Sequence, residues 1–248
     1  MQRLLFYCFL ILSFIFVDCG KKEKIHYLAD RDNLQNKPVN KKNIPDFMKP
    51  LPFSKEEITK VIYPTAYKKN SQYYYKENEI EYNIILREVH KGNVDNDDDL
   101  EYGIGTDLIP VKDKHNKYGF FTIFKTTPSE LKVFYQIKTA FESKRNIIDL
   151  SPNDNFGEIY IYEIASDISK NLIISKHIIY KYINNEFKII WEYADKYKDK
   201  PSVQCYFTDL PEIAGEDNFW EIVIKTGKKD IIYRWDSEKY ILEKTIKK

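Results

Sequence analysis

The hydrophobic pattern divides the chain into an apolar leader, a polar connecting segment and a long region of strand-like segments. Residues 4–17 form an apolar run in which only Cys8 and Ser13 are mildly polar. This length matches the hydrophobic region of a secretory signal peptide, whereas a bilayer span needs about 17–25 residues. An uncleaved anchor or a buried helix is the alternative. Residues 20–52 are rich in Lys, Asn, Asp and Pro without an apolar period, which predicts an extended tether.

The pattern after the tether predicts one short helix and then strands. Residues 54–57 (Ser-Lys-Glu-Glu) form a capping-box sequence before an apolar stretch, and Pro64 follows. This predicts a helix near residues 54–62. Residues 80–89 then mostly alternate apolar and polar side chains, and residues 73–75 are three tyrosines. A period of two and an excess of aromatic residues are typical of half-buried strands.

Two markers recur along the C-terminal part of the chain. Three acidic, turn-prone segments, at residues 93–101, 149–158 and 209–221, each lead into a strand-like stretch. Behind each segment a hairpin-like sequence follows, with strands that begin near Ile123, Ile179 and Ile232. Repetition at about 50–60 residues with several strands per unit suggests propeller-like units. The alternative is coincidence in a strand-rich sequence.

These patterns predict one β domain over residues 53–248, with three degenerate repeat units at about 90–140, 147–195 and 203–246. Aromatic residues make up 15% of the chain, including 20 Tyr and 15 Phe, a composition typical of strands. We expect an all-β fold, mainly an antiparallel meander, with a partial propeller-like or β-sandwich architecture and one short N-terminal helix.

Charge and motif content exclude several function classes. The formal net charge is +1, which gives no electrostatic basis for binding nucleic acid. Only 8 residues are Gly, and no phosphate-binding loop, nucleophile elbow or paired His motif occurs, so we predict no enzymatic activity and no catalytic residues. We expect His177 at the surface or at a sheet edge. Cys205 lies in a strand-like run and is interpreted as a buried, inert thiol rather than a nucleophile.

The first acidic segment is the strongest candidate for a binding site. Asn93, Asp95, Asp97 and Glu101 offer oxygen atoms at alternate positions and then at a later Glu. Ca²⁺ takes 6–8 oxygen ligands, and side chains with this spacing can converge on one ion. We therefore predict a weak Ca²⁺ site in this segment, with no other cofactor required. The alternative is a hydrated surface turn, because turns favour the same residue types.

The N-terminus resembles that of bacterial lipoprotein precursors. The residues that carry the resemblance are 16–19 (Phe-Val-Asp-Cys), Gly20 and the Lys-rich stretch that follows; the family has a small residue where this chain has Asp18. The resemblance implies that residues 1–18 are a removed signal peptide and that Cys19 is acylated, so that membrane lipid is a partner. Residues 19–52 would then be a lipidated tether. Gly20, rather than Asp, after the Cys favours the outer membrane over the inner membrane.

The repeat units resemble those of the bacterial FG-GAP or VCBS-type family, in which an acidic loop runs into a strand and a hairpin closes the unit. Asn93, Asp95, Asp97 and Glu101 fall on the ligand positions of that loop, and residues 233–235 (Tyr-Arg-Trp) are similar to the closing hairpin. The loop glycine is replaced here by Asp98. Three units are fewer than the four or more blades of a closed propeller, so an open sheet or a sandwich is as well supported as a ring.

Together these features predict an exported, lipid-anchored protein of the cell envelope that acts as a non-catalytic binding or surface module. Its ligand class is a protein or a glycan, and nucleic acid is excluded. The alternative function is a periplasmic hydrolase without a recognisable motif, and a passive envelope protein is a third hypothesis. A hydrolase predicts a deep pocket lined by polar side chains from separate strands, whereas a binding module predicts an exposed aromatic or apolar patch.

Overall fold

The computed structural model describes residues 53–95, 97, 99–113, 116–127, 130–151, 156–167, 172–197, 203–208 and 219–248. The predicted signal peptide (1–18) and the predicted tether with Cys19 (19–52) lie outside the described residues.

The predicted short helix is confirmed as α1 (Lys55–Ile62), which precedes the first strand. Its capping box is complete, because the Ser54 hydroxyl accepts the Glu57 N–H at 3.2 Å and the Glu57 carboxylate accepts the Ser54 N–H at 2.7 Å. Ile58 is buried and packs with Ile104 and Phe124 of the first sheet. The helix is therefore held both by its cap and by the apolar face of that sheet.

The first sheet has six antiparallel strands in sequence order: β1 (Tyr67–Lys69), β2 (Gln72–Glu77), β3 (Ile80–Gly92), β4 (Glu101–Pro110), β5 (Tyr118–Thr127) and β6 (Glu130–Ala140). The turns between β1 and β2 and between β2 and β3 are each two residues with positive φ, formed by Asn70 and Ser71 and by Asn78 and Glu79. Such turns match the twist of the flanking strands, so consecutive strands pair directly.

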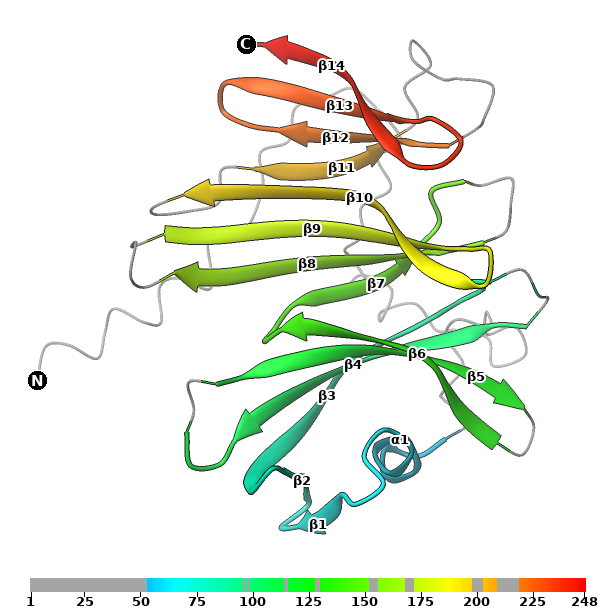
Figure 1. Ribbon diagram of the computed structural model, residues 1–248, viewed down its shortest axis with the longest axis vertical. Coiled ribbons are helices and arrows are strands. Elements are labelled where there is room, and N and C mark those ends of the chain that lie inside the picture. Colours follow the sequence, from blue (N-terminus) through cyan, green and yellow to red (C-terminus); the bar gives the residue numbers. More distant parts are fainter. Residues whose placement is uncertain are drawn as a thin grey trace, which may run out of the picture.

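The second and third sheets each contain four antiparallel strands, again in sequence order. The second comprises β7 (Lys144–Ile148), β8 (Glu158–Asp167), β9 (Leu172–Ile183) and β10 (Glu186–Tyr197). The third comprises β11 (Gln204–Thr208), β12 (Glu221–Lys225), β13 (Lys229–Trp235) and β14 (Tyr240–Lys247). The three sheets follow one another along the long axis of the molecule (Figure 1). The predicted antiparallel meander is confirmed, and the described strands do not close into a barrel.

The three sheets share two local features, a buried glutamate and a shift in strand register. A buried Glu begins the strand that follows each acidic segment: Glu101 in β4, Glu158 in β8 and Glu221 in β12. Each sheet also has a register shift between its last two strands, at Phe124, Tyr180 and Tyr233. A repeated unit would share both features, and the three-unit repeat remains a prediction.

Much of the hydrophobic core lies between successive sheets, and two further clusters join the first sheet to α1. Between the first and second sheets, Phe121, Ile123 and Ile137 pack with Ile159 and Ile161. Between the second and third sheets, a larger cluster joins residues from both: Ile148, Leu150, Ile179, Ile190, Trp191, Ile222, Ile224, Ile231, Trp235 and Tyr240. The second sheet therefore buries apolar side chains against both of its neighbours, which is how layered β folds remove such side chains from water.

The sequence-based expectation that His177 lies at the surface or at a sheet edge is wrong. His177 lies in β9, an interior strand, with 5% of its surface exposed. Its Nδ1 is 2.7 Å from the Tyr160 hydroxyl, and its ring contacts those of Tyr162 and Trp191. Burial lowers the pKa of His177 to about 4, because the imidazolium form loses its hydration.

The lowered pKa of His177 predicts loss of stability in acid. The unfolded chain takes up this proton near pH 6.5, whereas the folded chain takes it up only near pH 4. The free energy of unfolding should therefore fall between pH 6.5 and pH 4 by up to about 3 kcal/mol. Urea unfolding across this range should show a flatter pH dependence for His177→Phe than for the wild type. Tyr160→Phe, which keeps the imidazole buried, should retain the wild-type slope; equal slopes for all three proteins would contradict the assignment.

Candidate metal centre

The first acidic loop connects β3 to β4 and is built from successive side-chain turns. The backbone N–H of Asp95 donates to the Asn93 Oδ1 atom at 3.3 Å, that of Asp97 donates to Asp95 Oδ1 at 3.3 Å, and that of Asp99 donates to Asp97 Oδ1 at 2.9 Å. Asn and Asp favour such turns because their short side chains can accept the N–H two residues ahead. The alternating polar residues therefore shape the loop as well as supplying its charge.

Glu101 closes the loop at the first residue of β4. Its side chain is fully buried, and its Oε2 accepts the backbone N–H of Val94 at 2.9 Å. Its Oε1 is also buried and has no hydrogen-bond partner among the described residues. A buried carboxylate oxygen without a partner is costly, so this atom needs a proton or a cation beside it.

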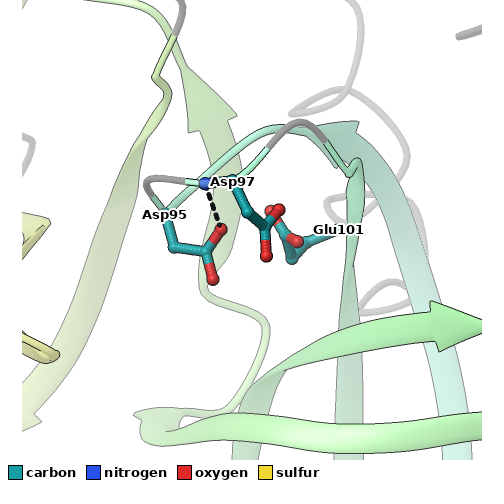
Figure 2. A group of neighbouring side chains, drawn as sticks. All are labelled: Asp95, Asp97 and Glu101. Atoms are coloured by element: carbon teal, nitrogen blue, oxygen red, sulfur yellow. Dashed lines mark hydrogen bonds between the residues drawn. The ribbon is translucent and has the colours of Figure 1, made fainter.

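Three carboxylates meet at this loop. One oxygen atom from each of Asp95, Asp97 and Glu101 lies within 4.8 Å of the other two. Figure 2 shows the Asp97 and Glu101 carboxylates side by side, with Asp95 joined to the Asp97 backbone by its hydrogen bond. Carboxylate oxygens are the ligands that Ca²⁺ and Mg²⁺ prefer, and their mutual repulsion is relieved by a cation.

Lys125 of β5 supplies a positive charge to the same cluster. Its Nζ contacts the Asp95 carboxylate and lies 2.6 Å from Asp97 Oδ2. Although burial acts to lower the pKa of Lys125, the hydrogen bonds to Asp95 and Asp97 raise it above its usual value. The ammonium group in turn lowers the pKa of Asp97. A cation from the neighbouring strand β5 therefore interacts with two of the three carboxylates of the loop.

The pKa of Glu101 is raised to about 7. Burial is the main cause, and the nearby negative charges of Asp95 and Asp97 act in the same direction; the Val94 N–H and Lys125 oppose them. A divalent cation at this position would favour the ionised carboxylate and so compete with the proton.

The structure brings together three of the four side chains predicted as ligands. Asn93 lies in the same loop, but its amide already accepts from the Asp95 N–H and donates to the Asp97 carbonyl. Sequence reasoning missed Lys125. The signal that could have found it is strand register, because Phe124 pairs with Tyr102 and so places Lys125 beside Glu101.

An aromatic cleft of about 290 Å³ adjoins the first acidic loop. It lies between β6 and the β9–β10 hairpin and is lined by Phe134, Tyr135, Tyr182, Asn185, Glu186 and Phe187. The Phe134 and Tyr135 rings lie 5.7 Å and 4.5 Å from the Phe187 ring. Lys125 Nζ is 4.7 Å from the centre of the Phe134 ring, a cation–π distance. One lysine thus contacts both the acidic loop and the wall of the cleft.

The second acidic segment resembles the first at its described end. Glu158 is fully buried, accepts the backbone N–H of Leu150 at 3.0 Å and forms an ion pair with Lys181. Among the described residues, the clustering of three acidic ligand atoms occurs only at Asp95, Asp97 and Glu101. A large part of the second and third acidic segments lies outside the described residues.

The remaining cysteine prediction concerns Cys205 of β11. Cys205 is half-buried and packs against the core cluster between the second and third sheets. Burial raises the pKa of the thiol, which keeps it protonated and weakens it as a nucleophile.

Comparison with known proteins finds no matching family model and no matching curated protein. Within the described part of the chain, no helix combines the length and the apolar character needed to cross a bilayer.

The contact between Lys125 and the acidic loop predicts a stability effect in the absence of metal. In the presence of a chelator, Lys125→Met should lower the free energy of unfolding by about 1–2 kcal/mol, because the three carboxylates lose their internal cation. The effect should be below that of a fully buried ion pair, since about a third of Lys125 is exposed. Denaturant unfolding measures it. Lys188→Met, which breaks an exposed pair with Glu186, should change stability by less than about 0.5 kcal/mol. Equal effects from the two variants would contradict the interaction.

Proposed function

We propose that this protein is an exported, lipid-anchored lipoprotein of the bacterial outer membrane that acts as a non-catalytic binding module. A divalent cation, Ca²⁺ by its ligand chemistry, binds in the first acidic loop and stabilises the domain. The ligand of the module is a protein or a glycan.

The observation that carries the cation site is the buried Oε1 of Glu101. This atom has no hydrogen-bond partner among the described residues, yet it belongs to a carboxylate clustered with Asp95 and Asp97. Lys125 contacts Asp95 and Asp97, and no ion pair joins it to Glu101. A divalent cation would satisfy all three carboxylates at once. The cluster contains one oxygen atom from each of these carboxylates, which is fewer than the 6–8 oxygens that Ca²⁺ takes. This supports weak binding, with a Kd of about 10⁻⁴–10⁻³ M.

The aromatic cleft supports a binding function over a purely structural one. Its wall combines four aromatic rings with the amide of Asn185 and the carboxylate of Glu186. Ligand sites commonly combine apolar walls with a few polar groups that orient the ligand. Because Lys125 contacts both Phe134 and the acidic loop, a cation that displaces Lys125 would also change the charge beside the cleft.

One observation favours the alternative function, a periplasmic hydrolase. A pocket of about 420 Å³ lies between the first and second sheets, and charged side chains from separate strands line it. The buried carboxylate beneath it, that of Asp107, is bound by two arginines, and Glu88 lies 3.4 Å from one of them. This arrangement suits ion binding better than acid–base catalysis, so the binding module is preferred.

Calcium titration tests the cation site. Calorimetry of the full chain in detergent should show binding at about millimolar Ca²⁺, and the midpoint of thermal unfolding should rise as the site fills. Glu101→Gln, which keeps the shape and removes the charge, should weaken binding at least about tenfold.

The matched control for this titration is Glu158→Gln. Glu158 occupies the same position in the second sheet and is equally buried, but it lies outside the cluster of three carboxylates. Its substitution should leave Ca²⁺ binding unchanged. A wild-type titration that is flat at millimolar Ca²⁺, with no thermal shift, would remove the metal centre from the proposal.

Replacement of Cys19 tests the lipid anchor. The proposal expects Cys19→Ser to lose labelling by a fatty-acid analogue and to leave the membrane fraction, because several acyl chains anchor a protein far more firmly than a leader that is cut away. Cys205→Ser serves as the control and should keep both the label and the membrane location. If Cys19→Ser still labels and still sediments with membranes, the protein is not a lipoprotein.

A further inference from the structure

The pocket between the first and second sheets is shaped by a β-bulge in β3. Pairing between β3 and β4 passes from Leu86 opposite Thr106 to Val89 opposite Ile104. Two consecutive residues, Arg87 and Glu88, therefore face the single residue between Thr106 and Ile104. A bulge redirects side chains that would otherwise point to opposite faces, and both of these charged side chains line the pocket.

Two glycines make room for the charged groups beneath the pocket. A Cβ atom on Gly105 would lie 2.7 Å from the Glu88 carboxylate, and one on Gly119 would lie 2.5 Å from Asp107 Oδ1 and would collide with the Arg145 guanidinium. A Cβ at either position would force these groups to shift, and at Gly119 it would also lie 2.8 Å from the backbone carbonyl of Thr106. The bulge and the glycines thus act together to place charged groups in a fold whose other interior contacts are mostly apolar.

Asp107 holds two arginines in place. Its fully buried carboxylate accepts from Arg145 Nη2 at 2.6 Å through one oxygen and from Arg87 Nε at 2.7 Å through the other. The Arg145 side chain is fully buried and also contacts Glu88 at 3.4 Å and Thr139 at 3.0 Å. Both guanidinium groups are therefore oriented before any ligand arrives, which lowers the entropic cost of binding.

The outer edge of Arg87 is only weakly used. Its Nη2 lies 3.5 Å from Glu142, whose side chain is 65% exposed. Glu142 belongs to the turn between β6 and β7 and has a φ of 57°, a left-handed conformation that is unfavourable for a residue with a Cβ. A strained turn therefore holds an exposed carboxylate at the outer edge of the Arg87 guanidinium. A ligand would bind at this same edge.

We propose that this pocket binds a small monocarboxylate whose carboxylate group takes the outer edge of Arg87 in place of Glu142. The planar guanidinium matches the two oxygens of a carboxylate. With Glu142 displaced, three cations, Arg87, Lys144 and Arg145, face two carboxylates, Asp107 and Glu88. This leaves one positive charge, which suits a monoanion, whereas Glu88 would repel a dianion such as phosphate. The site is separate from the acidic loop and does not depend on the cation proposed there.

Saturation-transfer NMR on the full chain in detergent tests the site, with sodium propionate as the probe. Inorganic phosphate serves as the dianion, at a pH above the second pKa of phosphoric acid, where the dianion predominates. Propionate should receive saturation and phosphate should not displace it. Arg87→Met should abolish the signal. Glu142→Gln, an exposed substitution that keeps Arg87 and Asp107 paired, should tighten propionate binding about two- to fivefold, the range expected when a competing exposed ion pair is removed.

The matched control is Arg234→Met. Arg234 is as exposed as Arg87 and its Nε also pairs with a carboxylate, that of Glu243, but it lies in the third sheet. This variant should bind propionate as the wild type does. The site would be overturned by absent saturation transfer in the wild type, by displacement with phosphate, by equal loss in Arg87→Met and Arg234→Met, or by unchanged affinity in Glu142→Gln. A folded Glu142→Gln protein keeps the test decisive even if Arg87→Met fails to fold.

Discussion

Buried carboxylates need a hydrogen bond, a proton or a cation, and this requirement organises the described part of the molecule. Glu101 and Glu158 begin corresponding strands, and each accepts a backbone N–H from the segment before it. Asp107 meets the same requirement with two guanidinium groups. Because an uncompensated buried charge costs several kcal/mol, each of these carboxylates fixes the elements that supply its partners. The loop positions and the joint between the first two sheets follow from these contacts.

The hydrophobic core supplies the surfaces on which these polar contacts are built. Each sheet is a simple meander that pairs with its sequence neighbours, so the strands alone do not determine how the sheets stack. The apolar clusters between successive sheets provide that order. Arg145 then adds a directional contact, because it projects from β7 of the second sheet onto Asp107 of the first. Apolar burial drives association of the sheets, and the ion pair specifies how they meet.

In each of the two candidate sites, a side chain of the protein partly neutralises an excess of charge of the opposite sign. In the acidic loop, three carboxylates exceed the positive charge supplied by Lys125, which is the basis of the cation site proposed there. In the pocket between the sheets, the arginines and Lys144 exceed the carboxylates of Asp107 and Glu88 once Glu142 moves away, which is the basis of the anion site proposed there. Lys125 and Glu142 are each partly exposed side chains that contact the opposite charge of their own site. Such internal counter-ions keep a charged site stable in the absence of its ligand and weaken ligand binding in return.

The class of fold, the short capped helix and the residues of the acidic loop could be predicted from the sequence, because alternation, capping and turn residues are local signals. Asp95, Asp97 and Glu101 are close in sequence, so their spacing alone indicates a common loop. Their approach within 4.8 Å was decided by tertiary structure, as was the role of Lys125, which depends on strand register. The burial of His177 could not be predicted from the sequence either, because it depends on which strand is interior and on what covers that strand. The pocket at Arg87 depends on a bulge in one strand, glycines in two others and an arginine from the second sheet. These residues are far apart in the sequence, so no local pattern predicts that they come together.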